Sequence, residues 1–149
     1  MERRAKVKLE GGQAVFLELA MAAALAQINP DERLCDNRVS TVDVNACLVE
    51  KLKRANQRLD RYVQAAIHRH KDEPAVRRGI LASQKAFEAY RKIECDTVFE
   101  AWKEGTIRGS MLLGCQIGLT DGRTHDVWQH WLEYMDSTPP ILPEPAPTK

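Results

Sequence analysis

The chain has 149 residues, which is the size of one ordinary folding unit. Hydrophobic residues make up 44% and charged residues 29%, a balance that excludes wholesale disorder. Lys and Arg number 22 against 21 Asp and Glu, so the charge does not favour nucleic acid or anionic lipid as a partner. No apolar run reaches 18 residues, so we expect no membrane-spanning helix.

The N-terminus has features of an export signal. Four basic residues precede an apolar stretch over residues 14–26, which ends in the small-x-small pattern Ala-Leu-Ala. We predict a signal peptide over residues 1–26. Its removal takes four of the 22 basic and three of the 21 acidic residues, so 18 of each remain. The alternative is an amphipathic helix packed on the domain, which Glu18 favours because a charge weakens a signal core.

The pattern of apolar residues predicts a first long helix that begins at Ser40 and Thr41. Asp43, three residues after Ser40, completes a capping signal. Apolar side chains then recur at steps of three and four, at Val44, Leu48, Leu52, Ala55, Leu59, Tyr62, Val63 and Ala66. His68 and His70 near its end are interpreted as cations at the negative end of the helix dipole, rather than as metal ligands.

Two further helices follow. The second runs from about residue 74 to residue 103, with Asp72 as its cap and Gly105 as its stop signal. The third begins with Ser110 as cap and ends near Tyr134. We see no strand alternation and no internal repeat.

The predicted fold is therefore all-α, a small bundle of three long helices with a short extra N-terminal segment. The domain is expected over residues 27–136. Residues 137–149 contain five prolines and are predicted to form a disordered tail.

The chain has four cysteines, Cys35, Cys47, Cys95 and Cys115. An even number in a short chain suits disulfides in an oxidising compartment. A zinc site would need closely spaced pairs, and the chain has no Cys-x-x-Cys, so zinc is a weak alternative. Free buried cysteines are the other alternative.

Spacing suggests how the cysteines pair. Cys95 and Cys115 lie ten residues on either side of Gly105, so two antiparallel helices joined there would bring them together. Cys35 and Cys47 lie six residues on either side of the start of the first helix. We predict these two disulfides as staples of the bundle, with the two other pairings formally open.

Motifs of catalysis are missing from the sequence. It contains no Gly-rich phosphate loop, no His-Glu-x-x-His and no Gly-x-Ser-x-Gly. A carboxylate pair for glycoside hydrolysis could be drawn from Glu88, Glu94, Asp96 and Glu100, but charges between helical stripes usually form a solvated surface. We expect no enzyme activity, no cofactor and no metal.

Several polar residues lie on or beside the apolar stripes of the second and third helices. Burying Arg91, Glu94 or Arg123 without a partner would be strongly destabilising. We predict that polar residues form a structural seam between these helices, with ligand binding as the alternative. The predicted seam consists of Gln84, Tyr90, Arg91, Thr120 and Arg123.

Four segments share the order and spacing of a known family. They are Ala55-Asn56 with Leu59-Asp60 and Tyr62; Gln84 to Arg91 leading to Glu94-Cys95; Gly105 to Ser110; and Cys115 with Leu119-Thr120 and Arg123. From about Cys35 to Leu132 the chain resembles the LprI-like lysozyme-inhibitor domain family. In the first segment, the usual Asp and Asn of that family appear here as Asn56 and Asp60.

The resemblance implies a small, all-helical, cysteine-bridged bacterial protein that is exported across the inner membrane. It implies a periplasmic or secreted domain that binds a protein partner of the envelope, with lysozyme as the favoured partner. The alternative is an envelope structural or interaction protein with another partner and no effect on lysozyme.

The interhelical segment is the first candidate for partner binding. Its glycines permit close backbone approach, and Arg108 could reach a carboxylate in a cleft. The candidate residues are Gly105, Thr106, Ile107, Arg108, Gly109 and Ser110, and a plain turn is the alternative. A second candidate surface is formed by Trp128, Trp131 and Tyr134, for which a core position is the alternative.

Overall fold

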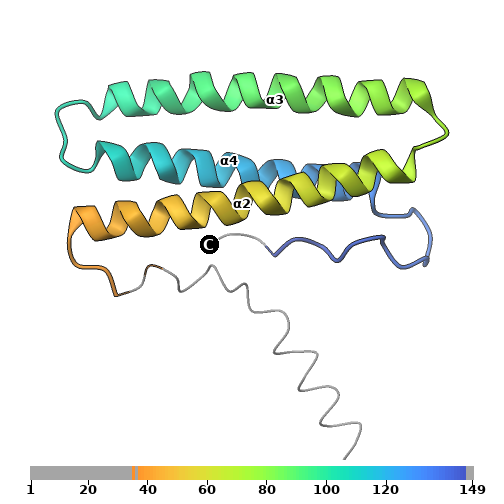
Figure 1. The fold of residues 1–149 in the computed structure, drawn as a ribbon, viewed down its shortest axis with the longest axis horizontal. Helices are drawn as coiled ribbons and strands as arrows, with labels where there is room; N and C mark the ends of the chain where they lie inside the picture. Colours follow the sequence, from red (N-terminus) through yellow and green to blue (C-terminus); the bar gives the residue numbers. More distant parts are fainter. Residues whose placement is uncertain (1–34, 36, 147–149) are drawn as a thin grey trace, which may run out of the picture.

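The fold is a bundle of three long helices (Figure 1). The computed structural model describes residue 35 and residues 37–146. The helices are α2 (Thr41–Arg69), α3 (Pro74–Ala101) and α4 (Arg108–Trp131). These residues contain no strand, and the all-α prediction is confirmed. The predicted signal peptide lies outside the described residues.

α4 is the central helix of the bundle. It packs against both α2 and α3, whereas α2 and α3 touch each other only slightly (Figure 1). One side of α3 therefore lies against α4, and within the described part of the chain no other helix covers its opposite side. In the described part of the chain, no helix is both long enough and apolar enough to cross a membrane.

The ends of α2 follow the local sequence signals. The Ser40 hydroxyl accepts a hydrogen bond from the backbone N–H of Asp43 at 3.1 Å, so the predicted cap is confirmed. At the other end, His70 Nδ1 lies 2.8 Å from a carboxylate oxygen of Glu73. Among the residues that the structure describes, no group of three or more potential ligands is placed to hold a metal ion.

The predicted caps of α3 and α4 are wrong. The backbone N–H of Glu73 donates to the carbonyl of His70, and Glu73, rather than Asp72, is the N-cap residue of α3. Pro74 occupies the first helical position. A backbone N–H there has no partner within the helix, so proline removes no helical hydrogen bond. α4 begins at Arg108 with Ile107 as its N-cap, so Ser110 lies inside the first turn, and its hydroxyl donates to Asn45 Oδ1 of α2 at 2.6 Å.

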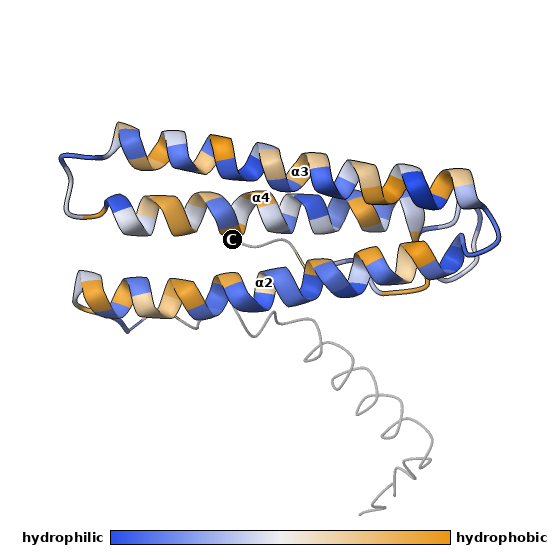
Figure 2. Cartoon of the chain, turned by 45° about the horizontal axis from the view of Figure 1, so that its top comes forward, coloured by the Kyte–Doolittle hydropathy of each residue, from blue (hydrophilic) through white to orange (hydrophobic). Residues whose placement is uncertain are grey.

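The apolar core lies toward the end of the bundle at which a turn joins α2 to α3. Its buried members are Leu59, Tyr62, Val63 and Ala66 of α2, Ile80 of α3, Val127 and Trp128 of α4, and Leu132 just beyond it. Trp131 packs against this cluster. The hydropathy colouring shows apolar positions alternating with polar ones along all three helices (Figure 2).

Both predicted disulfides are confirmed, and both lie toward the opposite end of the bundle. Cys35 bonds to Cys47, with 5.8 Å between Cα atoms, and Cys95 bonds to Cys115, with 5.6 Å. No cysteine in the described chain is free. Covalent links therefore hold the end of the bundle where the apolar core is sparse.

The proline-rich C-terminal segment has no helix or strand, but it is not detached from the bundle. Over residues 137–146, the prediction of a disordered tail differs from the structure. The carbonyl of Leu142 accepts from Trp128 Nε1 at 2.9 Å, and that of Pro143 accepts from the Tyr62 hydroxyl at 2.7 Å. Leu142 also packs against the core, so the segment covers the apolar contact between α2 and α4.

Candidate functional site

Arg91 links the three helices through neutral partners. From α3, its guanidinium donates to Asn56 Oδ1 of α2 at 2.8 Å and to the Thr120 hydroxyl of α4 at 2.5 Å. Thr120 is fully buried, and its hydroxyl donates in turn to the carbonyl of Gln116 at 2.6 Å. The charge of Arg91 thus sits in a chain of hydrogen bonds between helices.

Arg123 makes a second connection between α4 and α3. Its guanidinium donates to the Ser83 hydroxyl at 2.7 Å and, at a longer 3.4 Å, to Gln84 Oε1. The guanidinium carbon also lies 5.8 Å from the centre of the Phe87 ring. Burial lowers the pKa of Arg123, an effect that the negative charge of Asp126 partly offsets.

Four of the five predicted seam residues are brought together, and Tyr90 is not. Its side chain is 52% exposed and makes none of these hydrogen bonds, although it lines a surface hollow between α3 and α4 together with Phe87 and Arg123. Sequence reasoning also missed the ion pair between Arg58 and Asp121, which joins α2 to α4 beside the seam. Arg58 lies between the apolar positions of its helix, and no local signal in the sequence pairs it with a residue 63 positions away.

The buried polar side chains of the seam are all hydrogen-bonded. In the part of the chain that the structure describes, no buried side-chain nitrogen or oxygen lacks a hydrogen-bond partner. Such complete satisfaction is the usual condition of a structural network. This geometry supports the structural role that we propose for the seam.

The interhelical segment lies at the disulfide-bonded end of the bundle. The turn from α3 to α4 and the start of α2 are neighbours there (Figure 1). Gly109 faces α2 so closely that an added Cβ would come within 3.0 Å of Asn45 Nδ2. Gly109 therefore permits a close contact between α4 and α2 within the molecule.

Exposed apolar side chains and one arginine share this end of the bundle. We call the set the bundle-end surface; it consists of Val39, Val42, Trp102, Ile107 and Arg108. The two valines are 97% and 77% exposed, and Trp102 and Ile107 are each 42% exposed. The valines precede or begin α2, so only the tertiary contact between α2 and α4 brings them beside the turn.

Arg108 is the exposed cation of the bundle-end surface. Its guanidinium carbon lies 5.1 Å from the centre of the Phe99 ring, and it donates to the carbonyl of Lys103 at 3.5 Å. No ion pair with a carboxylate is formed by Arg108 within the described residues. The side chain is thus supported by a ring and a carbonyl, and its charge is available to a partner.

Residues 35–127 match the family model described as lysozyme inhibitor LprI. The chain belongs to this family. The match includes both disulfides, α2, α3, the seam and the interhelical turn. No curated protein and no solved structure matches the chain.

The second candidate surface of this LprI-family domain is part of the core. Trp128 is only 8% exposed, and its indole N–H is bound by Leu142. Trp131 packs on the core cluster, and the ring of Tyr134 lies under the guanidinium of Arg69 at 4.0 Å. The core alternative is therefore the correct one for the two tryptophans.

Proposed function

We propose that this LprI-family domain binds and inhibits a lysozyme-type muramidase, and that it catalyses no reaction itself. The family match over residues 35–127 is the observation that carries the proposal. Function depends on a particular surface rather than on a fold. Inhibition of lysozyme therefore requires a particular binding surface on this domain.

The bundle-end surface is the contact that we favour. Cys35–Cys47 ties the chain before α2 to that helix, and Cys95–Cys115 ties α3 to α4 behind the turn. A surface that is held in place before binding loses less conformational entropy when it binds. Exposed tryptophan and arginine are also the residue types that most often dominate binding energies.

Arg108 suits the chemistry of the proposed target. Glycoside hydrolases of the lysozyme type place two carboxyl groups in a substrate cleft. A guanidinium can donate two parallel hydrogen bonds to a carboxylate, which adds geometric selectivity to the charge attraction. An exposed arginine at the end of the bundle, which also presents the exposed side chains of Trp102 and Ile107, has the chemistry to engage such a cleft.

Export is part of the same proposal. Two disulfides in a chain of this size support an oxidising compartment, and lysozyme acts outside the cytoplasm. We propose that residues 1–26 are a signal peptide and that the mature domain is periplasmic or secreted. The N-terminal sequence of the protein recovered from the envelope would test the cleavage directly.

Inhibition is tested by titrating the purified, disulfide-bonded protein against several lysozymes acting on cell walls. We expect saturable loss of lysis, and a Ki about tenfold or more higher for Arg108→Ala and Trp102→Ala. Arg77→Ala removes the same charge near the other end of α3 and should leave the Ki unchanged. If no lysozyme is inhibited at any soluble concentration, the alternative of an envelope protein with another partner is favoured.

A further inference from the structure

α3 presents a continuous face of small and apolar residues to solvent. These residues recur at steps of four and three, which places them on one side of a helix. They are Ala75, Gly79, Ala82, Ala86, Ala89 and Ile93, and all six are exposed. The Ile93 side chain is 68% exposed, whereas α3 buries only Ile80 and Cys95 on its other side. We call this the outer face of α3.

The two halves of α3 differ in net charge. Residues 74–87 contain three basic residues and no acidic residue: Arg77, Arg78 and Lys85. Residues 88–101 contain four acidic residues, Glu88, Glu94, Asp96 and Glu100, against two basic residues, Arg91 and Lys92. The first turn has no acidic residue and the last turn has no basic residue. This order opposes the helix dipole, which favours acidic residues at the start and basic residues at the end. Helix stability therefore does not explain it.

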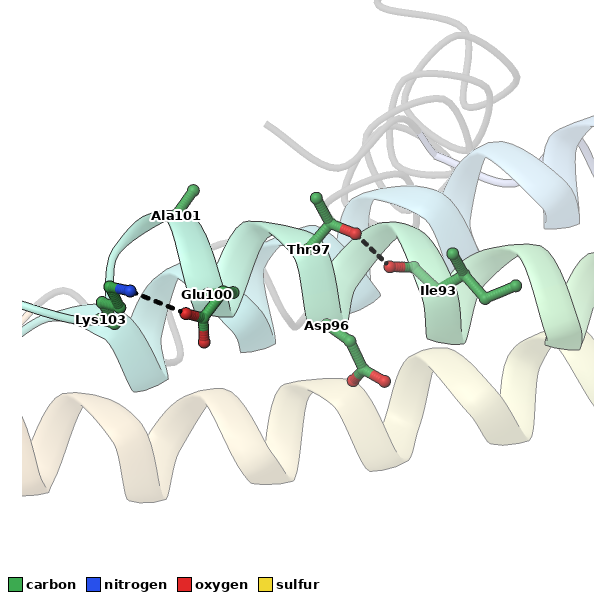
Figure 3. Close-up of a pocket in the computed structure, with 6 residues that line it drawn as sticks. All are labelled: Ile93, Asp96, Thr97, Glu100, Ala101 and Lys103. Atoms are coloured by element: carbon green, nitrogen blue, oxygen red, sulfur yellow. Dashed lines mark hydrogen bonds and ion pairs between the residues drawn. The ribbon is translucent and has the colours of Figure 1, made fainter.

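Part of the outer face is hollowed. An open, shallow hollow of about 580 Å³ runs along the second half of α3. Its lining residues, drawn in Figure 3, are Ile93, Asp96, Thr97, Glu100, Ala101 and Lys103. Its carboxylates pair only with exposed lysines, Asp96 with Lys92 at 2.5 Å and Glu100 with Lys103 at 3.1 Å. Exposed pairs of this kind contribute little and exchange readily. The hollow thus offers an apolar wall, two carboxylates whose lysine partners can exchange, and the ammonium group of Lys103.

We propose that the outer face of α3 is the interface of a symmetric homodimer, in which two α3 helices pair antiparallel. A two-fold axis near Ala89 would set Arg78 of one copy opposite Glu100 of the other, and Ala86 opposite Ile93. The basic, small-residue half of each helix then fills the acidic hollow of the other. A parallel pair would set like charges against each other, so the charge order selects the antiparallel arrangement of identical chains.

The small side chains support close pairing. Interhelical distances of about 8–10 Å depend on the size of the side chains at the contact, and alanine and glycine permit the short end of that range. An added Cβ at Gly79 would meet no atom within 4 Å, so its small size is not needed inside the monomer. The interface uses neither Arg108 nor the start of α2, and it does not depend on the lysozyme proposal.

Sedimentation velocity of the purified, disulfide-bonded protein over a wide concentration range tests the dimer. We expect a concentration-dependent dimer whose dissociation constant rises about tenfold or more in Arg78→Glu and in Glu100→Arg. Combining both changes in one chain should restore dimerisation, because the opposed charges are exchanged rather than removed. Ile93→Asp should give a monomer, and Glu133→Arg, an exposed charge reversal outside α3, should have no effect.

All of these substitutions are on exposed residues, so the helical circular dichroism should remain unchanged. A monomer at every concentration would overturn the proposal. So would a dimer that tolerates Ile93→Asp, or single charge reversals whose combination fails to restore pairing. Dimerisation that weakens as salt is raised would support the opposed charges.

Discussion

Arg91 is a single residue whose loss affects three helices at once. Its guanidinium is the donor to both Asn56 and Thr120, and Thr120 is fully buried. Arg91→Ala would leave these acceptors without that donor, so we expect the free energy of unfolding to fall by about 1–3 kcal/mol. Urea denaturation followed by circular dichroism measures the loss.

Tyr90 provides the matched control one position earlier in the same helix. It is 52% exposed and has no part in the seam, so Tyr90→Ala should change stability by about 0.5 kcal/mol or less. Equal losses for the two variants would contradict the structural role of Arg91. A stable Arg91→Ala protein that no longer bound its partner would instead place Arg91 in a functional surface.

Tyr62 couples alkaline pH to the C-terminal segment. Burial raises the pKa of Tyr62 above its ordinary value of about 10, against the smaller opposing effect of Arg61 and Arg58. A raised folded pKa means that the stabilisation is complete below the unfolded pKa and is lost as pH rises through the folded pKa. Ionisation also removes the proton that the Tyr62 hydroxyl donates to Pro143.

We therefore expect the free energy of unfolding to decline above about pH 10, and this part of the decline to be missing in Tyr62→Phe. Lysine deprotonation affects both proteins, so the difference between their stability profiles is the quantity to measure. If the stability profiles of the two proteins run parallel from pH 8 to pH 11, ionisation of Tyr62 has no effect on stability. The neutral Tyr62 hydroxyl then does not hold the C-terminal segment in place.

At the scale of the element, α4 has glycine at every fourth position along one line, at Gly114, Gly118 and Gly122. An added Cβ at any of them would meet no atom within 4 Å. Glycine is less favourable than alanine in a helix interior by about 0.8–1.0 kcal/mol. Each replacement by alanine should raise the free energy of unfolding by roughly that amount, measured by urea denaturation.

Gly109 is the contrasting glycine of the same helix. Its Cβ would lie 3.0 Å from Asn45 Nδ2, and Asn45 is held by Ser110. Gly109→Ala should therefore lower stability by about 1 kcal/mol, since the neighbour must shift. A gain at Gly109 equal to the gains elsewhere would show that Asn45 moves freely.

Local signals in the sequence predict the elements well, because spacing and caps act within a few residues. The three helices, the Ser40 cap and both disulfide pairs follow from periodicity and from equal distances to a turn. Two hydrogen-bonded pairs of the predicted seam, Arg91 with Thr120 and Arg123 with Gln84, involve polar side chains that interrupt apolar stripes, which is a signal visible in the sequence.

The misses depend on contacts between residues distant in sequence. Ser110 resembles a cap, but its hydroxyl is bound by Asn45, 65 positions away. Tyr90 lies at the edge of the contact between α3 and α4, where its side chain is half exposed and no local rule indicates that it stays outside the hydrogen-bonded seam. Prolines correctly indicate a segment without helix, but no local rule indicates that Trp128 will bind its backbone.

In the molecule as a whole, the two ends of the bundle are stabilised by different means. The core cluster of Leu59, Ile80 and Leu132 lies at one end, and the two disulfides lie at the other. Removing Cys95–Cys115 by replacing both residues with alanine should lower the free energy of unfolding by about 2–4 kcal/mol. Because the core end keeps its packing, the native protein should also loosen mainly at the disulfide end.

Hydrogen exchange can separate this local loosening from a uniform loss of stability. In the variant, amides of residues 95–101 and 109–116 should exchange much faster, and amides of residues 59–66 should change less. If the bundle-end surface binds lysozyme, its Ki should rise in the same variant even where the protein remains folded, since the turn is no longer held in place. Uniform acceleration along all three helices would mean that the bundle opens only as one unit, and that the disulfide does not fix the turn.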